Sequence, residues 1–156
     1  FVRQNVTGRL IASMVTSADP PLGLSFTVGE DESAQLRMLR PLVLGTAGYV
    51  GDLAQLGKAT ALLSTVLSAV DASPSAIEVG AALDGIHPDL RAAVYCLAVR
   101  AGDIDTYIAV RSLYEEEVLS VSEQDRLLDA LSCSLDPGAQ LDLLDFIFEP
   151  EVRLQD

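Results

Sequence analysis

The sequence predicts an all-α protein, and three observations support that prediction. Apolar residues make up 49% of the chain and are mostly Leu, Ala and Val, of which Leu and Ala are strong helix formers. Apolar positions recur with helical spacing along much of the chain. No segment alternates convincingly between apolar and polar residues. The stretch from Leu24 to Val28 is the only strand candidate, and it is more typical of an extended loop.

The first half of the chain is expected to hold three helices. The first runs from Phe1 to about Thr16, the second from Glu30 to about Tyr49, and the third from Leu53 to about Val70. A connection rich in proline and glycine separates the first two. We expect Gly48 and Gly51-Asp52 to form the break between the second and third helices, because glycine is a weak helix former.

Two parts of this half are less regular. In the second helix, the acids Glu30-Asp31-Glu32 are expected in the first turn, and Pro41 is expected to kink the helix. The segment from Ala72 to Gly85 contains Ser73-Pro74 and two glycines, and it gives the weakest helical signal. We interpret it as a loop with one short helix that starts near Ser75.

The clearest helix follows that segment. Pro88 and Asp89 are residues typical of a first helical turn, and Gly102 is expected to end the helix. Between them, the apolar residues keep the i, i+3, i+4, i+7 spacing of one helix face. They are Leu90, Ala93, Val94, Leu97, Ala98 and Ala101.

Three further helices are expected after Gly102, with very short joins. Asp103 is a natural N-cap for the first of them. Ser122-Glu123-Gln124-Asp125 has the spacing of a capping box and marks the second. Asp136-Pro137 starts the third, and Glu149-Pro150 is expected to close it, because proline disfavours the α conformation in the residue before it.

Helices that follow one another so closely are typical of stacked antiparallel hairpins. We therefore predict an irregular α-solenoid of about seven helices, similar in architecture to HEAT and armadillo arrays. A closed helix bundle is the competing all-α arrangement. The prediction is one helical-repeat domain over residues 1–156. Both ends of the chain resemble helices cut in mid-course, so we expect the chain to be part of a longer polypeptide.

The charge of the chain restricts its partners. Acidic residues number 23 and basic residues 10, for a net charge of −13, and Lys58 is the only lysine. We expect no nucleic-acid binding, which needs clustered basic residues, and no contact with an anionic membrane. No apolar run reaches the ~18–20 residues that span a bilayer. Twelve acids and three bases follow Thr106, which indicates a solvated acidic face or, as the alternative, a surface for basic partners.

A search for catalytic, cofactor-binding or metal-binding residues assigns none. His87 is the only histidine, so a two-histidine zinc site and the H-E-x-x-H motif are absent from this chain. Its position before Pro88 is typical of a helix start, although a catalytic base is the alternative. Cys96 and Cys133 lie in apolar helical surroundings that favour small core residues, while a disulfide stays possible. Asn5-Val6-Thr7 is a glycosylation sequon inside an expected helix.

Charged side chains are interpreted in the same way. Glu115-Glu116-Glu117 suggests a cation site, but successive helical residues diverge by ~100° and cannot all face one ion, so a solvated turn is favoured. Asp103 and Asp105 are interpreted as cap and first-turn charges. Four arginines could receive a substrate carboxylate, but pairing with nearby acids is favoured. They are Arg37, Arg40, Arg91 and Arg100.

Beyond these physical signals, the chain resembles a known family. Asp89-Leu90-Arg91-Ala92-Ala93-Val94-Tyr95-Cys96 is similar to a helix in the C-terminal domain of aminopeptidase N-type zinc metallopeptidases, the group that includes the endoplasmic-reticulum aminopeptidases. Other stretches follow the family pattern in the same order along the chain. They are Leu22-Gly23, Glu30 to Glu32 with Leu39-Arg40, Ala101 to Asp103 with Leu113-Tyr114, Ser122 to Pro137, and Val152 to Asp156.

The resemblance implies a function that the residues alone do not. In that family, a separate thermolysin-like domain holds zinc and removes N-terminal residues from peptides, and the C-terminal domain is a concave helical stack that covers the active site. The chain is therefore expected to be non-catalytic and to hold no cofactor. Its expected partners are the catalytic domain of the same polypeptide and peptide substrates, with zinc in that other domain. The alternative is a free-standing α-solenoid that binds a protein partner, and a small enzyme that uses His87 is a third hypothesis.

Overall fold

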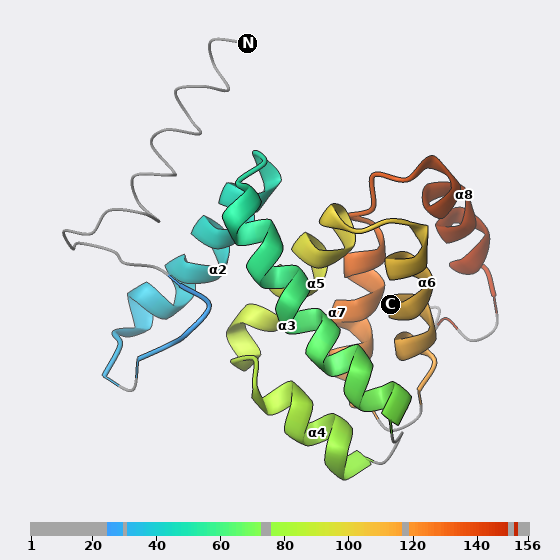
Figure 1. Cartoon of the computed structure of the whole chain (residues 1–156). Coiled ribbons are helices and arrows are strands. Elements are labelled where there is room, and N and C mark those ends of the chain that lie inside the picture. The colour runs from blue at the N-terminus through green and yellow to red at the C-terminus, as the bar shows by residue number, and fades with distance from the viewer. Residues whose placement is uncertain (1–24, 30, 73–75, 117–118, 150–151, 153–156) are drawn as a thin grey trace, which may run out of the picture.

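The computed structural model describes residues 25–29, 31–72, 76–116, 119–149 and 152. These residues form seven α-helices and no strand, which confirms the predicted all-α class (Figure 1). The helices are α2 (Ala34–Tyr49), α3 (Leu53–Ala72), α4 (Ala76–Asp84), α5 (Pro88–Ala101), α6 (Ile104–Tyr114), α7 (Val121–Leu131) and α8 (Pro137–Phe146). The helix expected from Phe1 to Thr16 and the sequon at Asn5 lie outside the described residues.

Helix α5 is the centre of the core. It packs against α2, α3 and α7, while α6 packs against α7. Figure 1 places α2 and α8 at opposite ends of the helix array. Because α5 has neighbours on several sides, it buries more than the one predicted stripe: Tyr95 and Val99 are buried together with Leu90, Val94, Leu97 and Ala98. The finer arrangement of these helices as an open solenoid stays a prediction.

The predicted starts of α6 and α8 and the predicted end of α5 are confirmed. The Asp103 carboxylate accepts the backbone N–H of Thr106 at 3.1 Å and caps α6. This bond to the Thr106 backbone, followed by one to its hydroxyl, lowers the pKa of Asp103. Asp136 caps α8 by accepting the N–H of Ala139 at 2.9 Å, and Pro137 occupies the first turn. Gly102 ends α5 as expected.

The boundaries of α2 differ from the prediction. Its N-cap is Ser33, so Asp31 and Glu32 precede the helix instead of occupying its first turn. Gly48 lies inside the helix and is not a break. The chain turns instead at Gly51, whose φ of 93° favours glycine, and the Asp52 carboxylate then accepts two backbone N–H groups at the start of α3. Pro41 lies within α2, and a kink there stays a prediction.

Three later boundaries also differ. The segment interpreted as mostly loop contains helix α4, which begins close to the predicted start at Ser75. Helix α7 begins at Val121 with Ser120 as its N-cap, so the capping box predicted at Ser122 was wrong by two residues. Helix α8 ends at Phe146. The predicted closing pair, Glu149-Pro150, follows this end in the sequence and therefore does not close the helix.

A disulfide joins α5 to the connection between α7 and α8. Cys96 and Cys133 form this bond, with Cα atoms 5.3 Å apart, so their interpretation as small core cysteines was wrong. The two residues are 37 positions apart in the sequence. A crosslink that closes a loop of this size typically stabilises a fold by about 2–4 kcal/mol, because it restricts the unfolded chain.

Helix α3 is the described helix whose length and composition would allow a membrane crossing, with 20 residues and a mean hydropathy of 1.3. Its buried residues follow a single stripe and pack against α5. They are Gln55, Ala59, Leu63 and Val66. One such helix is weak evidence for a membrane span, and 22% of its most apolar 18-residue window is buried in this fold.

Close contact between α2 and α5 depends on Gly48. A Cβ atom at this position would lie 2.4 Å from Cδ2 of Leu97 and 3.1 Å from its Cγ. Leu97 is 1% exposed and has little room to move. The absence of a side chain at Gly48 therefore sets the distance between these two helices.

We expect Gly48→Ala to lower the free energy of unfolding by about 1–3 kcal/mol, because the added methyl overpacks the contact with Leu97. Gly45→Ala is the matched control in the same helix. Nothing lies within 4 Å of a Cβ at Gly45, so this change should raise stability by about 0.5–1 kcal/mol through helix propensity. Urea denaturation followed by circular dichroism measures both, and equal effects would contradict the close contact.

Candidate functional site

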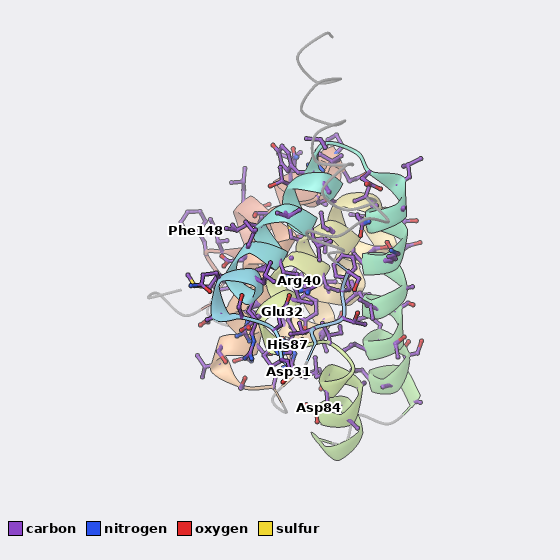
Figure 2. The ribbon with its side chains drawn as sticks, turned by 90° about the vertical axis from the view of Figure 1, so that its left-hand side faces the viewer. Asp31, Glu32, Arg40, Asp84, His87 and Phe148 are labelled. Carbon is purple, nitrogen blue, oxygen red and sulfur yellow. A yellow bond between two sulfur atoms is a disulfide. The ribbon has the colours of Figure 1, made fainter. Side chains whose placement is uncertain are left out.

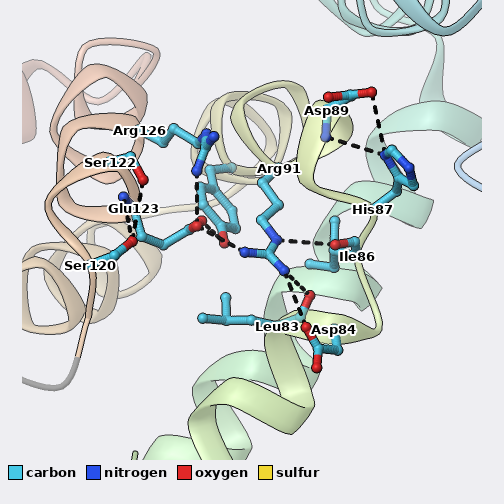
Figure 3. A network of polar contacts seen from close by, with 11 residues as sticks. Leu83, Asp84, Ile86, His87, Asp89, Arg91, Ser120, Ser122, Glu123 and Arg126 are labelled. Atoms are coloured by element: carbon cyan, nitrogen blue, oxygen red, sulfur yellow. Dashed lines mark hydrogen bonds and ion pairs between the residues drawn. The ribbon is translucent and has the colours of Figure 1, made fainter.

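A buried carboxylate links α5 to α7. Figure 3 shows Glu123 of α7 facing Arg91 of α5, with Arg91 Nη1 2.9 Å from Glu123 Oε2. The hydroxyl of Tyr95 donates to Glu123 Oε1 at 2.6 Å, and Arg126 Nη1 donates to Oε2 at 3.0 Å. The Glu123 side chain is only 3% exposed. Both of its oxygens are therefore occupied by charge-assisted or hydroxyl hydrogen bonds.

Arg91 also fixes the turn between α4 and α5. Its Nε donates to the carbonyl of Ile86 at 3.0 Å, and its Nη2 donates to the carbonyl of Leu83 at 2.9 Å. Burial, and then the hydrogen bond to Glu123, raise the pKa of Tyr95 well above its ordinary value. Tyr95 thus keeps its proton at neutral pH. These contacts connect α4, α5 and α7 through one network of hydrogen bonds.

His87 lies at the edge of this region and serves the local helix. Its Nδ1 accepts the backbone N–H of Asp89 at 3.3 Å, which caps the start of α5 (Figure 3). Nδ1 also lies 3.7 Å from the Asp89 carboxylate. This placement agrees with the expected role of His87 as a helix-start residue.

A second ion pair holds the segment before α2. Arg40 pairs with Glu32, and its Nη1 donates to the carbonyl of Ser25 at 2.7 Å. Figure 2 shows the Arg40 and Glu32 side chains beside each other, and they are 7% and 6% exposed. The pair and this hydrogen bond therefore connect Ser25 and Glu32 to α2.

The third cluster joins α6 to α8 and its C-terminal turn. Arg111 Nη1 lies 2.8 Å from the Asp142 carboxylate, and Nη2 lies 3.0 Å from that of Glu149. The guanidinium also stacks 4.1 Å from the ring centroid of Phe146. Burial and then Asp142 raise the pKa of Tyr107, whose hydroxyl donates to Asp142 at 2.9 Å. A surface pocket of about 520 Å³ adjoins Arg111 and Asp142.

Of the four arginines singled out in the sequence, two form ion pairs with acids and two do not. Arg40 and Arg91 form the expected ion pairs with acids. Arg37 donates only to the backbone carbonyl of Glu32, and Arg100 stacks on Tyr49. Neither of these two forms an ion pair with a residue that the structure describes.

The acids behave as charges on helix ends. Glu115 follows the last turn of α6 and lies 3.6 Å from Arg111, which agrees with the expected solvated turn. Glu117 lies outside the described residues. Asp105 is in the first turn of α6, where its negative charge favours the helix.

The donor atoms of this chain do not fit the zinc site of the resembled family. Within residues 25–152, apart from the undescribed gaps, no three His, Cys, Asp or Glu side chains are placed to hold a metal ion. The only histidine in the sequence, His87, uses Nδ1 in a helix cap. Cys96 and Cys133 are joined in a disulfide. A site of imidazole and thiolate ligands therefore cannot be built from these side chains.

Sequence reasoning missed the residues that form the largest clusters. Glu123 was interpreted as part of a capping box, and Arg111, Arg126 and Asp142 were not singled out. Arg126 lies only three positions from Glu123, but the other partners are distant in sequence: Arg91 and Glu123 are 32 positions apart, and Arg111 and Asp142 are 31 apart. The one available signal was the position of Glu123 on the side of α7 that carries Leu127 and Ala130, which marks it as facing the core.

The fold and these clusters define an all-helical module whose described polar residues mainly connect helices. A family model described as the ERAP1-like C-terminal domain matches residues 7–156. The chain belongs to this family, since the match covers nearly its whole length. This confirms the resemblance seen in the sequence to the C-terminal domain of an aminopeptidase family. A comparison with curated proteins found no match.

We expect Glu123→Gln to lower the free energy of unfolding by about 3 kcal/mol, because two buried or half-buried arginines lose their countercharge. Glu115→Gln is the control, since Glu115 is 47% exposed and its ion pair with Arg111 is 3.6 Å long. That change should cost less than about 0.5 kcal/mol. Urea denaturation at neutral pH gives both values, and a Glu123→Gln protein as stable as the control would show that the network is dispensable.

Proposed function

We propose that this chain is the non-catalytic C-terminal domain of a zinc aminopeptidase and that it encloses the cavity in which peptides bind. The observation that carries the proposal is the family match over residues 7–156. In this role the chain limits access of peptides to a catalytic domain of the same polypeptide. The zinc ion belongs to that other domain, and it supplies the Lewis-acid and water-activating chemistry of peptide hydrolysis.

The internal connections of the domain support this role. A domain that limits access to a cavity must keep its own structure when peptides bind. Closure of the cavity is simplest when such a domain moves as a rigid body. Helix α5 is connected to α7 by the Glu123 network and to the α7–α8 connection by the Cys96–Cys133 disulfide. Helix α6 is connected to α8 and its C-terminal turn through Arg111. These links favour a module that moves as a unit.

A free-standing interaction module is the alternative function, and the exposed apolar side chains of α8 and of the turn that follows it are compatible with both functions. Leu141, Leu144 and Phe148 are 66%, 58% and 85% exposed, and Figure 2 shows Phe148 projecting from the body. Exposed apolar side chains that cluster on one element often mark a protein contact. A neighbouring helix pair of the same polypeptide would cover them under the first proposal, and a separate protein under the second.

We expect the purified chain to hydrolyse no leucine p-nitroanilide, with or without added zinc, because its donor atoms do not build a zinc site. Absorbance of released nitroaniline is the measurement, with a zinc aminopeptidase as the positive control. Turnover that depends on zinc, or that His87→Ala removes, would contradict the proposal.

The coding sequence around the chain separates the two proposals. A reading frame that continues upstream through an H-E-x-x-H motif supports the aminopeptidase domain. In that longer protein, removal of residues 1–156 should abolish discrimination between peptides of different length. Hydrolysis of leucine p-nitroanilide should persist, because this small substrate does not need an enclosed cavity. A start codon directly upstream of Phe1 would favour the interaction module.

A further inference from the structure

A groove of about 520 Å³ lies between α6 and α8, which are neighbours in the helix array (Figure 1). The residues of α6 that line it form one stripe at helical spacing, from Ile104, the first residue of the helix, to Glu115, which follows its last. The stripe therefore runs along all of α6, a length of roughly 16 Å for a helix of this size. Gly138 and Asp142 of α8 line the other side of the groove.

The part of the groove near the start of α6 is apolar. Ile104 and Ile108 line it and are 37% and 51% exposed. Tyr107 lines the same groove but is 1% exposed, so it contributes to the floor. A partner that covered the two isoleucines would remove apolar surface from water, which favours binding.

The part of the groove near the end of α6 is acidic. Arg111 is the only basic residue among those that line the groove, and it pairs with the carboxylates of three acids, which are Asp142, Glu149 and Glu115. These acids are 42%, 42% and 47% exposed, whereas the arginine is 24% exposed and stacks on the ring of Phe146. Three negative charges against one positive charge leave a net charge of −2. The negative end of the α6 dipole lies at the same place and adds to this field.

The groove is distinct from the exposed leucines of α8. Gly138 and Asp142 line the groove and lie one turn apart on α8, whereas Leu141 and Leu144 do not line it. Helix α8 therefore turns one side towards the groove and carries its exposed leucines on another. A helix pair stacked on the leucines would contact a different side of α8 from the side that lines the groove.

We propose that the groove between α6 and α8 binds a basic amphipathic helix of a separate protein. Apolar residues of that helix contact Ile104 and Ile108, and its Lys or Arg side chains lie beside Glu115 and Asp142. Charge complementarity selects a basic partner, since the chain has a net charge of −13 and the groove itself is negative. The uncovered stripe along α6 selects a helix, since about three turns of a partner helix would lie along it.

The site goes beyond the proposed function, because it is a property of this chain and can be tested without a catalytic domain. Two capped peptides of about 18 residues are the probes, each with leucine on one helix face and either lysine or glutamate on the other. ¹⁵N-HSQC titration of the full chain is the measurement. We expect the lysine peptide to shift the backbone signals of Ile104, Ile108, Ser112 and Gly138 and to bind at least about tenfold more tightly than the glutamate peptide.

Two further conditions test the charge and the helix separately. Added salt should weaken binding of the lysine peptide, because salt screens exposed charges. A lysine peptide with a central proline keeps its charge but cannot form an unbroken helix, and we expect it to bind at least about tenfold more weakly.

Four variants make the test specific to the groove. Ile108→Ser should weaken binding of the lysine peptide at least about fivefold, because it removes apolar contact surface. Leu144→Ser is its matched control, since Leu144 is 58% exposed but does not line the groove. Glu115→Gln should weaken binding about threefold and reduce the effect of salt. Asp129→Asn is the control for that change, since Asp129 is an exposed acid of α7 that does not line the groove.

Equal binding of the lysine and glutamate peptides, or absence of shifts at the groove residues, overturns the proposal. Equal weakening by all four variants would also overturn it, because the peptide would then respond to the total charge of the chain and not to the groove. Stronger weakening by Leu144→Ser than by Ile108→Ser would place the contact on the exposed leucines of α8 instead. If the proline peptide binds as tightly as the helical one, a helical partner is excluded. None of these outcomes bears on the aminopeptidase proposal, which the anilide assay and the reading frame test independently.

Discussion

The structure depends on one buried carboxylate. Glu123 is removed from water and receives hydrogen bonds from Arg91, Tyr95 and Arg126. A buried charge is costly unless its partners replace the lost hydration, and here three donors from two helices do so. Because Arg91 also binds the carbonyls of the α4–α5 turn, the same group sets the positions of α4, α5 and α7. A shift of one helix against another would leave this charge unpaired, so we infer that the network favours one register of these helices.

The other connections extend this arrangement outwards from α5. Gly48 lets α2 approach Leu97, and the disulfide attaches the α7–α8 connection to Cys96. Arg111 then joins α6 to Asp142 and Glu149. In a chain so rich in acid, arginines that neutralise acids both at the core and at the periphery reduce the repulsion that the fold would otherwise carry. Arg37 and Arg100 are the exceptions, since neither forms an ion pair with a residue that the structure describes.

These features suit a domain that acts by shape. The family match assigns the chain to the ERAP1-like C-terminal domain, and its described polar groups are largely occupied in joining helices. A catalytic group, in contrast, must keep a free lone pair or proton facing a substrate. Both oxygens of Glu123 accept hydrogen bonds from neighbouring side chains, and His87 uses Nδ1 in a helix cap. The proposed role of enclosing a peptide cavity is consistent with such internal use of charge.

The sequence by itself determined the all-α class and those helix boundaries that depend on neighbouring residues. Pro88, Gly102, Asp103 and Asp136 marked helix ends correctly, because a cap or a proline acts within about four residues of its own position. The tertiary structure alone decided which charges are buried and which cysteines meet. Glu123 finds Arg91 across 32 positions, and Cys96 finds Cys133 across 37, so no local spacing could reveal either pair. Helix periodicity shows which face is covered, but the partner on that face is chosen by packing between distant segments.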